Sequence, residues 1–177
     1  MRALGWALLV VGCCVAAGVL ISRTLVPEPS ALHRGHAHYE RGEYAQAEAA
    51  YREALEENPD DFNALNNLAW MLATCPDRQH CDPEQAVELA QRAAALNPDD
   101  YILDTLATAL YESGRIEAAI EVQQRAVAAN MRKPESDKRA YLVGRLDRFK
   151  AERDRQAPSG LTGGAPPDAL PRQVESP

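Results

Sequence analysis

Pairs of alanines seven residues apart recur three times along this chain of 177 residues. The pairs are Ala47 and Ala54, Ala86 and Ala93, and Ala119 and Ala126, and each follows a further small residue, which is Gly35, Ala69 or Ala107. Two antiparallel helices joined by a turn approach closely only where a side chain is small. The recurrence therefore predicts three helical hairpins with small residues between their helices.

Glycines and prolines mark the expected ends of these helices. Gly42 and Gly114 stand where the first helix of a hairpin must stop, and glycine adopts a left-handed turn at no steric cost. Pro59 and Pro98 follow second helices, each within Asn-Pro-Asp-Asp, and the residue before a proline is pushed out of helical geometry. The aspartates that follow can cap the next helix and oppose its dipole.

This pattern resembles the tetratricopeptide repeat family over roughly residues 30–130. Units of that family are about 34 residues long. Gly35 and Ala69 are 34 residues apart, whereas Ala69 and Ala107 are 38 apart, and the excess lies in the loop 74–83. The second unit therefore looks like a long-loop variant familiar from bacterial proteins. The resemblance implies an all-α solenoid of three repeats over residues 25–133, which binds a peptide or protein in a concave groove.

A different pattern follows the third unit, which has no closing proline. Leu142, Leu146 and Phe149 share one helical face among charged residues. A solenoid needs such a helix at its end, because its last repeat would otherwise expose its core. We therefore expect a capping helix over residues 134–156 and a disordered tail over the proline- and glycine-rich residues 157–177.

Charge is distributed unevenly between these parts. Residues 31–130 carry 18 acidic and 7 basic side chains, whereas residues 132–155 carry 9 basic and 5 acidic ones. An acidic repeat body disfavours nucleic acid as a partner, because phosphates would be repelled. The basic stretch either contacts lipid headgroups or an acidic partner, or is simply a solvated helix face.

The first 24 residues contain an uncharged apolar run over residues 3–22, bracketed by Arg2 and Arg23. A helix of twenty residues spans about 30 Å, the thickness of a bilayer's hydrocarbon core. We expect a transmembrane anchor that is not cleaved. The alternatives are a cleaved secretory signal and a lipoprotein signal acylated at Cys13, which ends a stretch resembling a lipobox.

Cys75 and Cys81 lie in the inserted loop with five residues between them. One interpretation is a disulfide, because such a pair commonly oxidises outside the cytosol. The other is two free thiols, with Cys75 partly packed. The pair favours an extracytoplasmic repeat domain, which would be periplasmic in a bacterium with two membranes.

The first helix of each unit has a second stripe opposite its core stripe. The candidate groove residues on these stripes are His36, Tyr39, Asn63, Asn66, Asn67, Trp70, Tyr101, Asp104, Thr105 and Thr108. Trp70 would be a flat apolar anchor for a partner, and the amides could hydrogen-bond an extended backbone. The alternative is that Trp70 packs against a neighbouring helix of the array.

One known subfamily of these repeats grips the acidic tails of chaperones with Lys, Arg and Asn side chains in the groove. Only Asn67 matches this clamp, whereas Leu32, His36, Tyr101 and Thr105 stand at its other positions. A groove without basic donors holds a buried carboxylate poorly. We therefore expect no chaperone-tail binding.

Catalytic and metal-binding motifs are absent from the sequence. It has no glycine-rich phosphate loop before a helix, no His-Glu-x-x-His and no Gly-x-Ser-x-Gly. Cys75, His80 and Cys81 are three potential zinc ligands, but they all lie on one loop. Structural zinc sites use four ligands from two separated pairs, so these three do not predict a zinc site. The cluster of His33, His36 and His38 has no carboxylate or cysteine to complete a site. We therefore expect that the chain is not an enzyme and that it binds no cofactor or metal ion.

Two functions remain open from the sequence. The first is a membrane-anchored adaptor that binds a peptide or protein partner, in envelope assembly or cytochrome maturation, where similar repeat proteins occur. The second is a structural subunit whose repeats pack permanently against copies of the chain or a larger complex.

Overall fold

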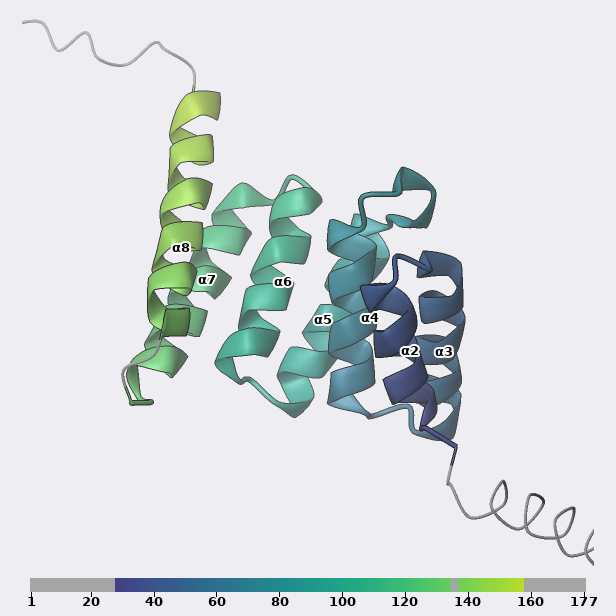
Figure 1. Ribbon diagram of the computed structural model, residues 1–177. Coiled ribbons are helices and arrows are strands. Elements are labelled where there is room, and N and C mark those ends of the chain that lie inside the picture. Colours follow the sequence, from purple (N-terminus) through teal and green to yellow (C-terminus); the bar gives the residue numbers. More distant parts are fainter. Residues whose placement is uncertain (1–27, 135–136, 158–177) are drawn as a thin grey trace, which may run out of the picture.

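The computed structural model describes residues 28–134 and 137–157, which form seven α-helices and no strand. The helices are α2 (Ala31–Glu40), α3 (Tyr44–Glu57), α4 (Phe62–Thr74), α5 (Pro83–Leu96), α6 (Asp100–Glu112), α7 (Ile116–Met131) and α8 (Asp137–Gln156), with the short 3-10 helix η1 (Arg78–His80) between α4 and α5. Successive hairpins stack side by side in chain order, and α8 ends the row (Figure 1). The prediction of an all-α solenoid is confirmed.

The N-terminal anchor and most of the expected tail fall on residues 1–27 and 158–177, outside the described ranges. Within residues 28–134 and 137–157, no helix is long and apolar enough to cross a membrane. The membrane anchor over residues 3–22 and the alternative acylation at Cys13 therefore stay predictions.

The helix ends lie where glycine, proline and aspartate predict them. Gly42 and Gly114 have φ angles of +73° and +80°, which are left-handed values that glycine adopts freely. The second helices α3 and α5 end two residues before Pro59 and Pro98. Asp61 then caps α4, because its carboxylate accepts hydrogen bonds from two backbone N–H groups of the first turn at 2.9 and 3.2 Å.

Small residues allow the helices of each hairpin to approach. Ala47, Ala86 and Ala119 are fully buried, as the alanine pattern requires. At Gly35 the need is stricter, because a Cβ atom there would lie 2.6 Å from the ring of Tyr51. The α2–α3 hairpin therefore pairs a glycine with a buried tyrosine, a large-to-small fit that fills the first repeat.

The last helix joins the common core through its apolar face. Leu142, Leu146 and Phe149 of α8 are buried against α7 and the end of α6. The Phe149 ring stacks on Tyr111 of α6 with centroids 4.5 Å apart. These contacts cover the apolar end of the third repeat, where a further hairpin would otherwise be needed.

Candidate functional site

Trp70 lies on α4 and contacts side chains from two other helices. Its indole Nε1–H, on α4, donates a hydrogen bond of 3.2 Å to Tyr39 Oη on α2. The guanidinium of Arg145, on α8, lies 5.3 Å from the centroid of the same ring, which is within cation–π range. Trp70 therefore connects α2, α4 and α8 while staying partly exposed.

Arg145 crosses over α6 to reach Trp70. On the way, its Nε lies 3.6 Å from Asp104 Oδ1, and a further guanidinium N–H donates to Thr108 Oγ1. The Tyr141 ring lies 5.0 Å from the guanidinium carbon. The Arg145 side chain is only 16 % exposed, so this is a largely desolvated cation held by one carboxylate and two aromatic rings.

Asp104 is the buried anion of this cluster. Burial raises the pKa of its carboxyl group, although the charge of Arg145 and a hydrogen bond from Gln123 both act to lower it. Gln123 Nε2 donates to Asp104 Oδ1 at 3.0 Å and to the backbone oxygen of Leu142 at 3.1 Å. Asp104 and Gln123 therefore join α6, α7 and α8 in one polar network under the surface.

A second line of contacts crosses the same helices nearer their N-terminal ends. Tyr101 Oη on α6 donates to Asn63 Oδ1 on α4 at 3.1 Å, and Lys138 Nζ on α8 lies 5.3 Å from the Tyr101 ring centroid. Lys138 also lies 3.2 Å from Asp100 Oδ1. Lys138 and Arg145 are seven residues apart, so they lie on one face of α8.

Asp100 anchors the N-terminal end of α6 to the last two helices. Burial alone would raise its pKa, but hydrogen bonds from Asn130, Lys133 and Lys138 outweigh burial and lower the pKa to about 2. The carboxylate is therefore fully ionised at neutral pH, and it holds two lysines against the repeat body.

The candidate groove residues separate into two groups. Asn66, Asp104, Thr105 and Thr108 are buried, with exposed fractions of 3–7 %. They form a floor beneath the surface, and in this conformation a partner reaches them only through other side chains. The partly or fully exposed group consists of His36, Tyr39, Asn63, Asn67, Trp70 and Tyr101.

Sequence reasoning missed Lys138, Tyr141 and Arg145, which α8 adds to this surface. The signal that could have found them is two cations seven residues apart with a tyrosine between them. The basic stretch is not uniformly solvated, because Lys138 and Arg145 pair with carboxylates of α6, and contact of its other basic residues with lipid headgroups or an acidic partner stays a prediction.

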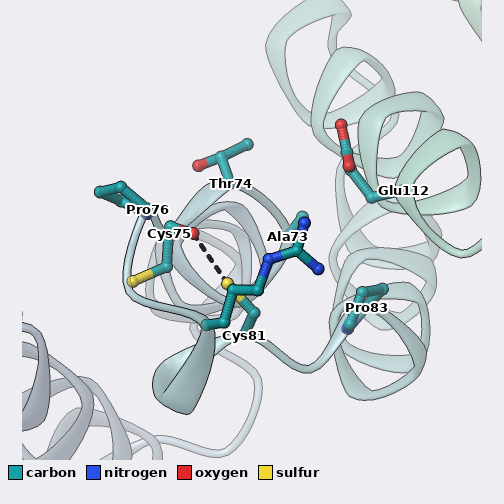
Figure 2. Close-up of a pocket in the computed structure, with 8 residues that line it drawn as sticks. Ala73, Thr74, Cys75, Pro76, Cys81, Pro83 and Glu112 are labelled. Carbon is teal, nitrogen blue, oxygen red and sulfur yellow. Dashed lines mark hydrogen bonds between the residues drawn. The ribbon is translucent and has the colours of Figure 1, made fainter.

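The loop between α4 and α5 forms a separate site. An open pocket of about 530 Å³ lies beside it, lined by Cys75, Cys81 and Arg78 of the loop and by Glu112 of α6, among others (Figure 2). Both cysteines are free thiols in this structure, and a disulfide between Cys75 and Cys81 stays a prediction. Among the described residues, no three His, Cys, Asp or Glu side chains are arranged to hold a metal ion.

Comparison with known families decides the identity of the repeats. One family model, described as a TPR repeat, matches residues 35–71, and a second, described as a tetratricopeptide repeat, matches residues 78–134. Together the two matches cover more than half of the chain. The chain belongs to the tetratricopeptide repeat family. No curated protein matches its sequence.

Solved tetratricopeptide repeat structures have the same fold. The Sgt2 TPR domain from Aspergillus fumigatus is 24 % identical with a TM-score of 0.59, over 85 % of this chain and 92 % of that one. The TPR2B domain of yeast Sti1, in its pHsp70 complex, is 18 % identical with a TM-score of 0.58, over 71 % of this chain and 94 % of that one. These two likenesses show the fold alone.

A third neighbour belongs to a much longer protein. An O-GlcNAc transferase mutant from Thermobaculum terrenum is 26 % identical with a TM-score of 0.50, over 56 % of this chain and 18 % of that one. This chain therefore spans less than a fifth of that transferase.

In tetratricopeptide repeat terms, α2, α4 and α6 are the first helices of three repeats, and α8 follows as a single helix.

Proposed function

We propose that this tetratricopeptide repeat protein is an adaptor that binds an extended segment of a protein partner on the exposed surface of α2 and α4. The observation that carries the proposal is the placement of Trp70. Its ring is held by Tyr39 and Arg145 yet stays partly exposed among the side chains of Asn63 and Asn67. A fixed, partly exposed tryptophan is the kind of anchor that dominates binding energy.

The amides beside Trp70 supply polar groups for contact with a partner's backbone. Asn63 Oδ1 accepts from Tyr101, and Asn67 Oδ1 accepts from Asn66 Nδ2 at 3.4 Å. Each carbonyl oxygen already accepts one hydrogen bond, and the Nδ2 groups of Asn63 and Asn67 can donate to a partner's backbone carbonyls. A partner with a free extended backbone and an apolar side chain over Trp70 fits this surface.

The charges on this surface support the expectation that acidic chaperone tails are not its ligands. Lys138 and Arg145 bring two cations from α8 to this surface, but each is already paired with Asp100 or Asp104. A carboxylate ligand would have to compete with these internal carboxylates. We therefore propose a partner segment without clustered negative charge.

Membrane attachment is a further part of the proposal, and it rests on the sequence of residues 3–22 alone. We propose that this segment tethers the repeats outside the cytoplasm, where envelope assembly or cytochrome maturation would supply partners. A reporter domain fused after Pro177 tests the orientation. Reporter activity found only in the cytoplasm would contradict it.

Site-specific photo-cross-linking in cells tests the binding surface. A photoreactive amino acid replaces His36, whose side chain is 61 % exposed on α2. The matched control carries it at Met131, which is 61 % exposed at the end of α7. We expect a defined protein adduct from position 36, an adduct yield about tenfold lower from position 131, and loss of the adduct with Trp70→Ala.

Two results would count against the adaptor. Equal adducts from both positions would show that the α2–α4 surface is not selective. An adduct containing only two copies of the chain would instead support the structural alternative, in which the repeats pack against one another. Circular dichroism of Trp70→Ala should retain the helical signal, so that loss of the adduct reports lost binding rather than unfolding.

A further inference from the structure

The loop over residues 75–82 brings its two cysteines together. The backbone N–H of Asp82 donates to the Leu72 carbonyl at 3.0 Å, which closes the base of the loop. Within it, the Cys81 thiol donates to the backbone oxygen of Cys75 at 2.7 Å (Figure 2). The sulfur of Cys81 therefore lies directly against residue Cys75.

The two thiols differ in access. Cys75 is 6 % exposed at the end of α4, and burial raises the pKa of its thiol. Both cysteines line the open pocket next to α6, but Cys81 is partly exposed. Because thiol reactivity depends on access and on thiolate content, a reagent in solution meets Cys81 first.

We propose that Cys81 and Cys75 form a thiol–disulfide exchange pair, in which Cys81 takes up a disulfide reagent and Cys75 then resolves the mixed disulfide. The co-reactant is a low-molecular-weight or protein disulfide. The inference does not depend on the proposed partner-binding surface, because it uses different residues.

The exchange balances in two steps. The Cys81 thiolate attacks one sulfur of the reagent disulfide, which breaks the reagent's S–S bond and releases one thiolate that takes up a proton. The Cys75 thiolate then attacks the Cys81 sulfur and releases the second thiol. The two cysteines are oxidised to one disulfide, and the reagent is reduced to two thiols.

The contacts of the loop favour the second step over a stable adduct. The thiol of Cys81 already lies against the backbone oxygen of Cys75, so the second step requires the Cys75 side chain, which points away from Cys81 in Figure 2, to rotate toward it. Outside this contact, His80 Nδ1 lies 3.7 Å from Glu48 Oε2 of α3, which keeps the loop folded against the first repeat. The bridge would fix the connection between α4 and α5 and the wall of the pocket that faces Glu112.

The test uses the full chain in detergent with Cys13→Ser and Cys14→Ser, which leaves only the two loop thiols. With N-ethylmaleimide, we expect Cys81 to be labelled at least about tenfold faster than Cys75, because a buried thiol must wait for local opening. With oxidised glutathione, we expect the intact mass to fall by two hydrogens and a peptide that links Cys75 to Cys81.

Single substitutions in the same background test the order of the steps. Cys75→Ser should stop at one glutathionyl group on Cys81, and Cys81→Ser should react about tenfold more slowly than the parent. A parent that keeps a stable glutathionyl group, or Cys81→Ser reacting as fast as the parent, would overturn the proposal. If a substitution unfolds the chain by circular dichroism, the labelling order and the product mass of the parent decide the question.

Discussion

The α2–α4 face and the α6 face of the first helices use the same repeat geometry but differ in what lies over their polar residues. On α2 and α4, side chains such as His36, Asn63 and Asn67 are partly or fully exposed. On α6, Asp104 and Thr108 are buried under the side chain of Arg145. The difference shows that a side chain from the neighbouring helix, and not the repeat itself, buries these two residues of α6.

The cations of α8 explain how the second half is covered. Every cation–π contact within the described ranges uses an α8 cation, namely Lys138 over Tyr101, Arg145 over Trp70 and Tyr141, and Arg148 over Tyr111. Long cationic side chains extend past the helix that carries them and cover aromatic surface. The helix is therefore attached by an apolar face and by a strip of cations beside it.

The largest effect is expected from breaking the apolar face of α8. Phe149→Ala removes a buried ring that stacks on Tyr111, and it should lower the free energy of unfolding by about 3–5 kcal/mol. Urea unfolding followed by circular dichroism measures the loss. Val143→Ala is the control, because Val143 is 38 % exposed and should change stability by less than about 0.5 kcal/mol. Equal losses would show that α8 is not fixed by its apolar face.

Arg145→Met tests the polar attachment and should cost about 2–4 kcal/mol, because it leaves the carboxylate of Asp104 buried without its cation. In a double-mutant cycle, the same change in an Asp104→Asn background should cost markedly less. Trp70 fluorescence should also change when the guanidinium leaves its ring. Additive effects of the two substitutions would refute the pairing.

The first repeat is tested by Gly35→Ala, which should lower the free energy of unfolding by about 1–3 kcal/mol. The added methyl group would lie 2.6 Å from the Tyr51 ring, a buried side chain with little space to move. Gly144→Ala on α8 is the matched control, because no atom lies within 4 Å of a Cβ there. That control should stabilise the helix by about 0.5–1 kcal/mol. A harmless Gly35→Ala would mean that the first hairpin is looser than its contacts indicate.

The smallest effect is a pH dependence from Asp100. Its pKa is lowered from 3.8 to about 2 in the fold, so the unfolded chain binds this proton more readily. The stability from Asp100 is complete above about pH 4 and is lost as the pH falls through about 2, a loss of about 1–2 kcal/mol.

The control for this pH dependence is Asp100→Asn, which should flatten the stability profile between pH 4 and pH 2. Asp104 acts in the opposite direction, because its raised pKa favours the protonated form in the fold. Its contribution is present at low pH and decreases as the pH rises through its folded pKa. An unchanged profile in Asp100→Asn would place the acid sensitivity elsewhere.

The parts of the fold that depend only on residues close together in the sequence could be predicted. Gly42, Gly114, Pro59 and Pro98 mark helix ends because they restrict the backbone locally. The inserted loop was also predicted, because it changes the spacing between Ala69 and Ala107. The candidate groove residues share a helical face, but a helical face does not reveal which of its residues a later helix will bury.

By itself, the sequence determined that the chain is a row of close helical hairpins, because small residues and turn residues act over distances of a few positions. Only the tertiary structure decided that Arg145 lies over the ring of Trp70, because the two residues are 75 positions apart in the sequence. Such a contact depends on the angle at which α8 packs and on the reach of a long side chain, and helical periodicity specifies neither. For this reason, only the folded molecule shows which residues of the candidate surface on α2, α4 and α6 stay exposed.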